Sequence, residues 1–219
     1  EMNKLKVFYT ASTNPWFNLA TEDWIFRDLD PKDPVLYLWR NQETVVIGRF
    51  QNPWTECNLP KMENENVLLA RRQSGGGAVF HDLGNTNFTF LNDRADYNKH
   101  ANNQIIINAL SSLGITAKAS GRNDIIVEHQ GEDKKISGSA FKENRDRAFH
   151  HGTMLINANL GKLAEYLNPD KSKIISKGIA SVRSRVMNIS ELNSQIDHNV
   201  FCDAMVKAFC EFYQKDVDI

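Results

Sequence analysis

The sequence predicts an α+β fold in which a mixed β-sheet is packed by helices. Short β-type segments follow one another and are interrupted by only a few helical ones. Apolar residues make up 41% of the 219 residues and aromatic residues 10%, which is enough for a hydrophobic core. No repeat, low-complexity tract or linker divides the chain, so we expect one domain over residues 1–219. Strict alternation of strand and helix is missing, which disfavours a Rossmann fold or a barrel.

Helices are predicted where a start signal and an apolar periodicity coincide. Asn14 and Pro15 are typical of an N-cap followed by the first helical position. In the second predicted helix, apolar residues recur at i, i+3, i+4 and i+7, and Gly114 follows as a C-terminal signal. Pro169 ends the third predicted helix, Leu160–Leu167. The predicted helices span Trp16–Leu29, His100–Leu113, Leu160–Leu167 and Phe201–Tyr213.

Strands are predicted for short apolar segments bounded by polar or glycine-containing turns. We expect the Leu83-Gly84-Asn85 turn to join the fourth and fifth of them into a hairpin. In chain order the predicted strands are Val35–Trp39, Thr44–Ile47, Val67–Arg72, Ala78–Asp82, Thr86–Phe90, Ile115–Ala119, Ile125–His129, Lys135–Phe141 and Phe149–Asn157.

Charge and cysteine content exclude several classes of protein. Lys+Arg 26 against Asp+Glu 27 gives a net charge of −1, so no field attracts nucleic acid or a membrane surface. Cys57, Cys202 and Cys210 are too few for a disulfide framework or a cysteine-rich zinc site. No signal peptide is visible, and no apolar run reaches the roughly 20 residues that span a bilayer. We expect a cytoplasmic enzyme.

Three consecutive glycines, Gly75 to Gly77, are the most informative feature of the sequence. They lie between two predicted strands, and Arg71 and Arg72 precede them. Glycines let a ligand approach bare backbone, and successive N–H groups bind anions. No Gly-Lys-Ser/Thr follows, so this is not a Walker loop. A wide β-bulge or a flexible turn is the alternative interpretation.

A polar loop, Ser120–Asp124, comes directly before a predicted strand. Asn123 and Asp124 there offer oxygen ligands of the kind that Mg²⁺ prefers. A plain turn is the alternative.

Lys135 begins a predicted strand that is rich in small residues. Because side chains alternate along a strand, we expect Lys135, Ser137 and Ser139 on one face and Ile136 and Ala140 on the other. Small neighbours leave room for a ligand, and the lysine offers a point charge to phosphate or carboxylate. A solvent-exposed lysine on a hairpin is the alternative.

Two further motifs are candidates for a binding site, a pair of histidines and a basic segment. His150 and His151 are adjacent on a predicted strand and therefore point to opposite faces, a poor arrangement for a shared metal. Neither H-E-x-x-H nor paired cysteines occur, and no G-x-S-x-G elbow supports a serine triad. Lys177–Arg185 is basic and rich in small residues, so it is either a loop that closes over an anionic ligand or a solvated loop.

Taken together, these motifs closely resemble the bacterial lipoate–protein ligase A family, part of the lipoyl/biotinyl protein ligases. The resemblance is carried in one register by Pro15–Ala20, Leu38–Asn41, Val45–Arg49, Asn52–Trp54, Arg71–Asp82, Ser120–Asp124, Lys135–Ala140, His150–Thr153 and Lys177–Arg185. It implies the fold shared with biotin–protein ligases and a two-step reaction. Lipoate and MgATP give lipoyl-AMP and pyrophosphate, and the lipoyl group then passes to a carrier lysine.

The resemblance also implies the site residues. Lys135 would be catalytic, contacting the lipoyl carbonyl and the α-phosphate, with Asp124 for Mg²⁺. Residues implied for ATP and the adenylate are Arg72, Gly77, Ala78, Val79, Phe80, Asn123, Asp124, Lys135, Lys177 and Arg183. Residues implied for lipoate are Glu22, Arg71, Ser74, Gly75, Gly76, His81, Lys135, Lys142 and His151. Lys142 stands where the family pattern has Arg, which keeps the charge and loses the bidentate fork.

The implied partners are the lipoyl carrier domains of 2-oxoacid dehydrogenase E2 subunits and the glycine-cleavage H protein. Family members usually have a further C-terminal accessory domain, and we expect residues 1–219 to be the catalytic domain without it. Two alternative functions remain: an octanoyl or lipoyl transferase that uses a preformed activated donor, and a non-catalytic lipoate-binding module. Octanoyl transferases of this fold use a cysteine nucleophile, and none of the three cysteines lies in the acyl-site motifs.

Overall fold

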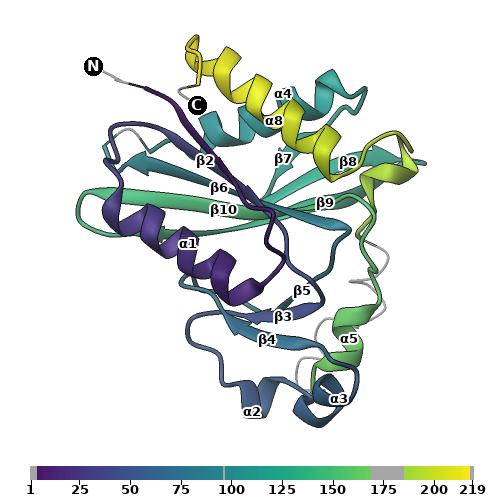
Figure 1. Cartoon of the computed structure of the whole chain (residues 1–219). Helices are drawn as coiled ribbons and strands as arrows, with labels where there is room; N and C mark the ends of the chain where they lie inside the picture. The colour runs from purple at the N-terminus through teal and green to yellow at the C-terminus, as the bar shows by residue number, and fades with distance from the viewer. Residues whose placement is uncertain (1–3, 96, 169–184, 218–219) are drawn as a thin grey trace.

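A computed structural model describes residues 4–95, 97–168 and 185–217 and shows an α+β fold built on two β-sheets (Figure 1). The larger sheet has seven strands in the order β1-β2-β6-β10-β9-β8-β7. Only β1 and β2 are parallel, and the other neighbours are antiparallel. The strands are β1 (Lys6–Tyr9), β2 (Val35–Trp39), β6 (Asn85–Asp93), β7 (Lys118–Ser120), β8 (Asp124–His129), β9 (Glu132–Glu143) and β10 (Arg147–Leu155).

The smaller sheet has three strands in the order β4-β3-β5. Its members are β3 (Thr44–Ile47), β4 (Leu68–Arg71) and β5 (Val79–His81), with β3 parallel to β4 and antiparallel to β5. It has a small core of its own, where Val45, Ile47 and Met62 pack with Tyr166. Three short helices accompany it: α2 (Pro53–Glu56), α3 (Leu59–Asn64) and α5 (Lys162–Tyr166).

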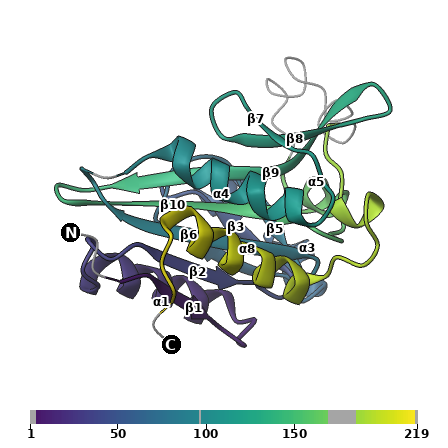
Figure 2. The ribbon, with the colours of Figure 1, turned by 90° about the horizontal axis from the view of Figure 1, so that it is seen from above.

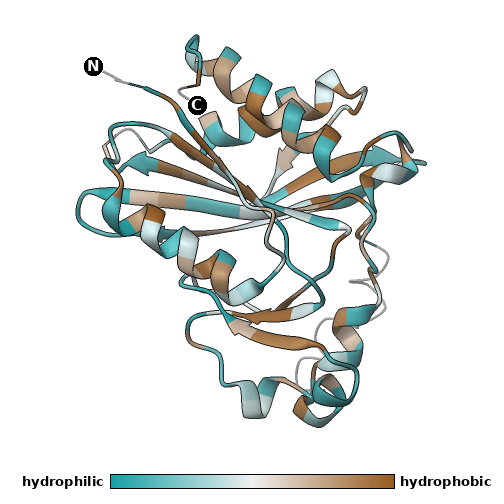
Figure 3. Cartoon of the chain, in the orientation of Figure 1, coloured by the Kyte–Doolittle hydropathy of each residue, from teal (hydrophilic) through white to brown (hydrophobic). Residues whose placement is uncertain are grey.

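Long helices cover both faces of the larger sheet (Figure 2). Helix α1 (Pro15–Asp28) lies on one face, while α4 (Lys99–Ser112) and α8 (His198–Tyr213) lie side by side on the other. The main core forms between the sheet and α4 and α8. Hydrophobic residues alternate with hydrophilic ones along these strands and helices (Figure 3). A short 3-10 turn, Ile189–Glu191, precedes α8.

Side-chain caps explain where the long helices begin. The carboxamide oxygen of Asn14 accepts hydrogen bonds from the backbone N–H groups of Trp16 and Phe17. Asn98 caps α4 and Asp197 caps α8 in the same way. These caps satisfy N–H groups that have no partner within the helix.

The predicted hairpin between β5 and β6 is wrong. Strand β5 pairs with β3 in the small sheet, whereas β6 pairs with β2 and β10 in the large one. The turn between them is bound to the end of β10, because the carbonyl oxygen of Gly84 accepts from the N–H groups of Ile156 and Asn157. The turn therefore passes the chain from one sheet to the other.

None of the helices in the described part of the chain combines the length and the apolar character needed to cross a membrane.

Candidate functional site

The glycine loop, residues 72–78, connects β4 to β5 and lies against Gly48. The carbonyl oxygen of Gly76 approaches so closely that a Cβ atom at Gly48 would lie 2.1 Å from it. Gly76 has φ +108°, a conformation that other residues rarely adopt. The backbone N–H of Arg49 donates to the carbonyl oxygen of Ser74 at 2.9 Å. The loop is therefore a packed structure with a defined backbone, while Gly76 and Gly77 remain exposed.

The two arginines before the loop hold backbone carbonyls. Arg71 Nη1 donates to the carbonyl oxygens of Gly48, Arg49 and Gln51 at 3.2, 3.0 and 2.7 Å. The buried Arg72 donates to Ser74 Oγ at 3.1 Å and to the carbonyl oxygen of Gly75 at 2.9 Å. Burial lowers the pKa of Arg72. Arg72 therefore shapes the glycine loop, and Arg71 shapes the segment 48–51 beside it.

Four of the side chains that the resemblance implies for lipoate lie together in a buried cluster at the glycine loop. Glu22, Ser74, His81 and His151 are only 2, 1, 4 and 7% exposed. His151 Nδ1 lies 2.9 Å from Glu22 Oε2, and His151 Nε2 lies 2.5 Å from Ser74 Oγ. Helix α1, the glycine loop and β10 therefore meet through polar side chains.

His81 belongs to the same cluster as a neutral group. Its Nδ1 accepts a hydrogen bond from Asn41 Nδ2 at 3.1 Å. Burial, with smaller contributions from the nearby Arg72 and His151, lowers the pKa of His81 to about 3. The imidazole thus carries no charge at neutral pH.

A β-bulge in β9 corrects the predicted face of Lys135. Ile125 is paired with Ser137, but the next residue, Ile126, is paired with Lys135, so the register skips Ile136. Ile136 packs in the main core, and Ser137 is completely buried. Strict alternation predicts that Lys135 and Ser137 share a face. Because of the bulge, they do not. Lys135 shares one with Gly138, where an added Cβ would lie 3.1 Å from Lys135 Nζ.

This shared face is the one that α1 covers. Lys142 is paired with Phe149, and paired residues point to the same side of a sheet. The Lys142 ammonium lies 5.1 Å from the ring centre of Phe26 in α1 and 3.3 Å from Oε1 of Gln73 in the glycine loop. Desolvation lowers the pKa of Lys142. Lys135, Lys142 and His151 thus lie on one side of the sheet.

Asp124 forms an ion pair with the ammonium of Lys135. Lys135 Nζ and Asp124 Oδ1 are 3.2 Å apart, and the two side chains are 38% and 30% exposed. Among the residues that the structure describes, no three acidic, histidine or cysteine side chains gather as a metal site. A single carboxylate that shares Mg²⁺ with phosphate oxygens is a common arrangement, and Asp124 fits it. Asn123 lies in the exposed turn before it.

The two adjacent histidines point to opposite faces, as predicted. His151 joins the polar cluster, whereas His150 is fully buried between Phe88, Phe90 and Phe141. Neither ring nitrogen of His150 has a hydrogen-bond partner, and burial lowers its pKa to about 3.

The cysteines show no sign of an activated thiolate. Cys57 and Cys202 are buried, and Cys210 is half-buried. Burial raises the pKa of all three thiols, that of Cys202 to about 12. This disfavours the transferase alternative that depends on a cysteine nucleophile.

Lys177 and Arg183 of the predicted basic loop lie outside the described residues. The chain after this segment joins the site directly: the N–H of Lys135 donates to the carbonyl oxygen of Arg185, and the N–H of Met187 donates to that of Lys135.

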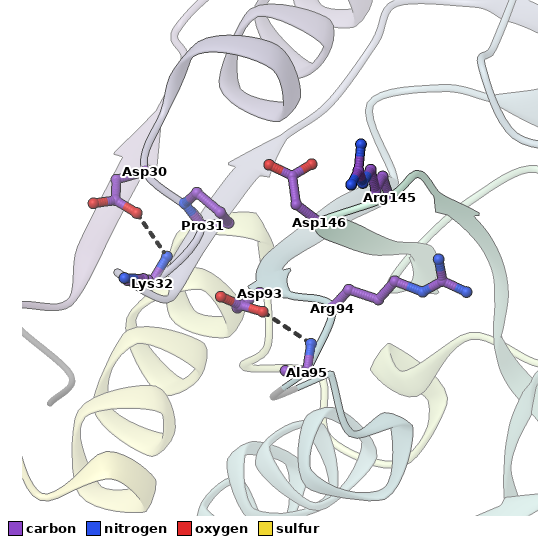
Figure 4. A pocket seen from close by; sticks show the side chains of 8 residues that line it. All are labelled: Asp30, Pro31, Lys32, Asp93, Arg94, Ala95, Arg145 and Asp146. Atoms are coloured by element: carbon purple, nitrogen blue, oxygen red, sulfur yellow. Dashed lines mark hydrogen bonds between the residues drawn. The ribbon is translucent and has the colours of Figure 1, made fainter.

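A separate hollow of about 650 Å³ lies among the loops after α1, β6 and β9 (Figure 4). Three carboxylates and three basic side chains line it, together with a proline and an alanine: Asp30, Pro31, Lys32, Asp93, Arg94, Ala95, Arg145 and Asp146. Its lining contains none of the predicted site residues. This hollow therefore does not mark the proposed site, and its mixed charges show no preference for one sign of ligand.

Sequence reasoning missed several residues of the cluster. Thr89 Oγ1 donates to Glu22 Oε2 at 2.6 Å and accepts from Trp39 Nε1 at 3.0 Å. Asn18 Nδ2 donates to Asn41 Oδ1 at 3.0 Å. No residue spacing in the sequence predicts these contacts, because they join strands and a helix that are far apart in the chain.

Comparison with known proteins gives a consistent result. The sequence profile of the lipoyl protein ligase A/B catalytic domain matches residues 14–210. Lipoate-protein ligase A of Psychrobacter cryohalolentis is 62% identical over 215 residues, which cover 98% of this chain and 62% of that protein. This chain thus spans about three fifths of the length of that curated relative.

Two solved structures are similar over nearly the whole chain. P. falciparum LipL1 in complex with lipoate is 41% identical with a TM-score of 0.83, over 98% of this chain and 64% of that one. A bipartite lipoate protein ligase from Thermoplasma acidophilum, studied with its E2 lipoyl domain, is 28% identical with a TM-score of 0.88, over 98% of this chain and 86% of that one.

Proposed function

The chain belongs to the lipoyl protein ligase A/B catalytic domain family, and on that premise we propose that it is the catalytic part of an ATP-dependent lipoate–protein ligase. In the first step a lipoate carboxylate oxygen attacks the α-phosphorus of ATP, and the bond to the β-phosphate oxygen breaks. Lipoyl-AMP and pyrophosphate form. In the second step a carrier lysine amine attacks the acyl carbon and loses a proton, and AMP leaves.

One observation carries this proposal: the bulge in β9 brings the half-exposed Lys135 onto the face where His151 contacts the glycine loop. A fixed ammonium near backbone N–H groups is suited to oxygens that gain negative charge in both steps. Asp124 holds that ammonium in place and offers a carboxylate oxygen to Mg²⁺.

The proposed substrate site combines exposed groups with the buried polar cluster beside them. Exposed Gly76 and Gly77 offer backbone to the ligands, and Lys142 offers a cation beside Gln73 for the lipoate carboxylate. For the adenylate we propose Arg72, Gly77, Ala78, Val79, Phe80, Asn123, Asp124 and Lys135. For lipoate we propose Glu22, Arg71, Ser74, Gly75, Gly76, His81, Lys135, Lys142 and His151.

We further propose that the acceptors are lipoyl carrier domains, those of 2-oxoacid dehydrogenase E2 subunits and the glycine-cleavage H protein. The T. acidophilum ligase was studied with its E2 lipoyl domain, which supports the first of these. The net charge of −1 does not favour nucleic acid.

The test separates the two half-reactions. Pyrophosphate release from ATP is measured with and without lipoate, and lipoylation of an added E2 lipoyl domain is followed by mass spectrometry. A second series supplies preformed lipoyl-AMP in place of ATP and lipoate. We expect a lipoylated carrier in the second series and lipoate-dependent pyrophosphate in the first. Tight binding of lipoyl-AMP with neither product would instead indicate a non-catalytic binding module.

A further inference from the structure

A continuous chain of buried polar side chains runs from helix α1 to the glycine loop. Thr89 Oγ1 and His151 Nδ1 lie 2.6 and 2.9 Å from the same carboxylate oxygen of Glu22. On its other side, His151 Nε2 lies 2.5 Å from Ser74 Oγ. Ser74 Oγ in turn accepts from Arg72 Nε at 3.1 Å. The contacts connect β6, α1, β10 and the glycine loop.

A neutral His151 beside an ionised Glu22 satisfies every hydrogen bond of this chain. An ionised Glu22 can only accept, so Nδ1 of a neutral His151 carries the proton and donates it to the carboxylate. Nε2 then accepts the hydroxyl proton of Ser74, and a lone pair of Ser74 Oγ accepts from Arg72. Glu22 therefore selects the tautomer of His151, as a carboxylate behind an imidazole commonly does.

Hydrolases use a similar acid, imidazole and hydroxyl to create a nucleophile, but Ser74 is placed differently. Its side chain is 1% exposed, so an acyl carbon has no access to Oγ. One of the two lone pairs of Oγ also accepts from the guanidinium of Arg72, which lowers the nucleophilicity of the oxygen. The chain of contacts therefore holds the serine rather than activating it.

Holding Ser74 determines the backbone of the glycine loop. The carbonyl oxygen of Ser74 accepts from the N–H of Arg49, and Arg72 Nη2 donates to the carbonyl oxygen of the following Gly75. Gly76, with its positive φ, then packs against Gly48. A shift of Ser74 would therefore be passed to Gly75 and Gly76.

We propose that Glu22 and His151 are positioning residues, which act through Ser74 to hold residues 74–76 in the conformation that receives the ligands. This assignment rests on the proposed ligase function. Neither residue needs to touch the reacting atoms for this role. Ligand binding to a loop that is already ordered avoids the entropy of ordering it, so the contribution is to affinity.

The test compares His151→Leu and Glu22→Leu with Glu22→Gln as the conservative variant and Thr21→Val as the matched control. Thr21→Val removes a hydroxyl from α1 next to Glu22, one that donates to the carbonyl oxygen of Phe17 and takes no part in the chain of contacts. Hydrogen exchange is measured on the protein without ligand at the N–H groups of Arg49 and Arg72, which donate to the carbonyl oxygens of Ser74 and Ile47. Calorimetry then gives the Kd for lipoyl-AMP, and single-turnover transfer gives the rate at saturation.

We expect both leucine variants to speed exchange of the Arg49 and Arg72 N–H groups tenfold or more and to raise the Kd tenfold or more, while the saturated rate changes less than threefold. Glu22→Gln should fall between them and the parent, and Thr21→Val should match the parent. Unchanged exchange of these N–H groups in the leucine variants would overturn the proposal. So would a hundredfold loss of saturated rate at unchanged Kd, which would place His151 at the reacting atoms. Because exchange is measured without ligand, it remains informative even if the proposed reaction does not occur.

Discussion

The ammonium of Lys135 lies 3.2 Å from a carboxylate oxygen of Asp124, and the strand positions of the two residues make this contact possible. Asp124 is paired with Gly138, which has no side chain, and the bulge turns Lys135 toward that space. The cation is thus held at a half-exposed position without being buried.

We expect Lys135→Met to slow transfer from preformed lipoyl-AMP by about 10²-fold or more, the order of loss when one preorganised donor is removed. The charge acts on oxygens that become more negative in the transition state, so the rate should change more than ligand affinity. Single-turnover kinetics measure the effect. Lys134→Met is the control, because Lys134 is paired with the core residue Val127 and points to the opposite face. Equal losses in both variants would indicate a general charge effect.

Asp124→Asn separates the two half-reactions. The amide keeps the shape of the side chain but removes the negative charge that attracts Mg²⁺ and Lys135. We expect pyrophosphate release to require about tenfold more Mg²⁺, whereas transfer from preformed lipoyl-AMP should fall less. Magnesium titrations of both reactions test this. An unchanged magnesium requirement would remove Asp124 from the proposed metal site.

Gly77→Val should abolish lipoyl-AMP binding and leave the fold intact. A Cβ at Gly77 meets no atom within 4 Å, so the protein itself has room for the new side chain. We place the adenylate in this same space, and the valine side chain would fill it. Calorimetry with lipoyl-AMP measures affinity, and thermal unfolding verifies the fold. Unchanged affinity would show that the loop does not contact the adenylate at this position.

His150→Phe should make stability less sensitive to acid. Burial lowers the pKa of His150 from 6.5 to about 3, so between these values the unfolded chain binds a proton that the folded chain does not. Folding stability therefore falls as pH decreases from 6.5 to 3, by about 1.4 kcal/mol per pH unit for this group. Without the imidazole, the slope of unfolding free energy against pH should be reduced by that amount.

Urea unfolding at several pH values between 7 and 4 provides the measurement. His100→Phe, at an exposed position in the first turn of α4, is the matched control for the loss of an imidazole. An unaltered slope in His150→Phe would mean that the buried ring does not resist protonation in the folded state.

Much of the fold was predictable because local signals determine it. The strands Val35–Trp39 and Thr44–Ile47 occur with the predicted bounds, and the long helices begin where Asn or Asp caps them. The short helices α2 and α3 also start with an asparagine cap and a proline in the first turn, a signal that was applied only at Asn14. The sequence does not predict strand β1, because it has only four residues and depends on β2 for its hydrogen bonds.

The errors arise where tertiary contacts decide between local alternatives. A glycine turn between two β-type segments predicts a hairpin, but docking of Gly84 on the end of β10 separates the strands into two sheets. Alternation along β9 fails because the bulge at Ile136 cannot be read from a single strand. The resemblance to a family supplied the site residues. Only the structure showed that Arg72 and Ser74 are buried and hold the loop.

The link between Glu22 and His151 also has a consequence for how the protein is made. The two residues are 129 positions apart, and the pairing of β10 with β6 and β9 must be complete before they meet. At typical rates of synthesis, roughly 6 to 26 seconds separate the addition of Glu22 from that of His151. During that interval α1 and the glycine loop lack their shared anchor. We expect the ligand site to be among the last parts of the chain to gain protection during folding, because contacts so distant in sequence form slowly.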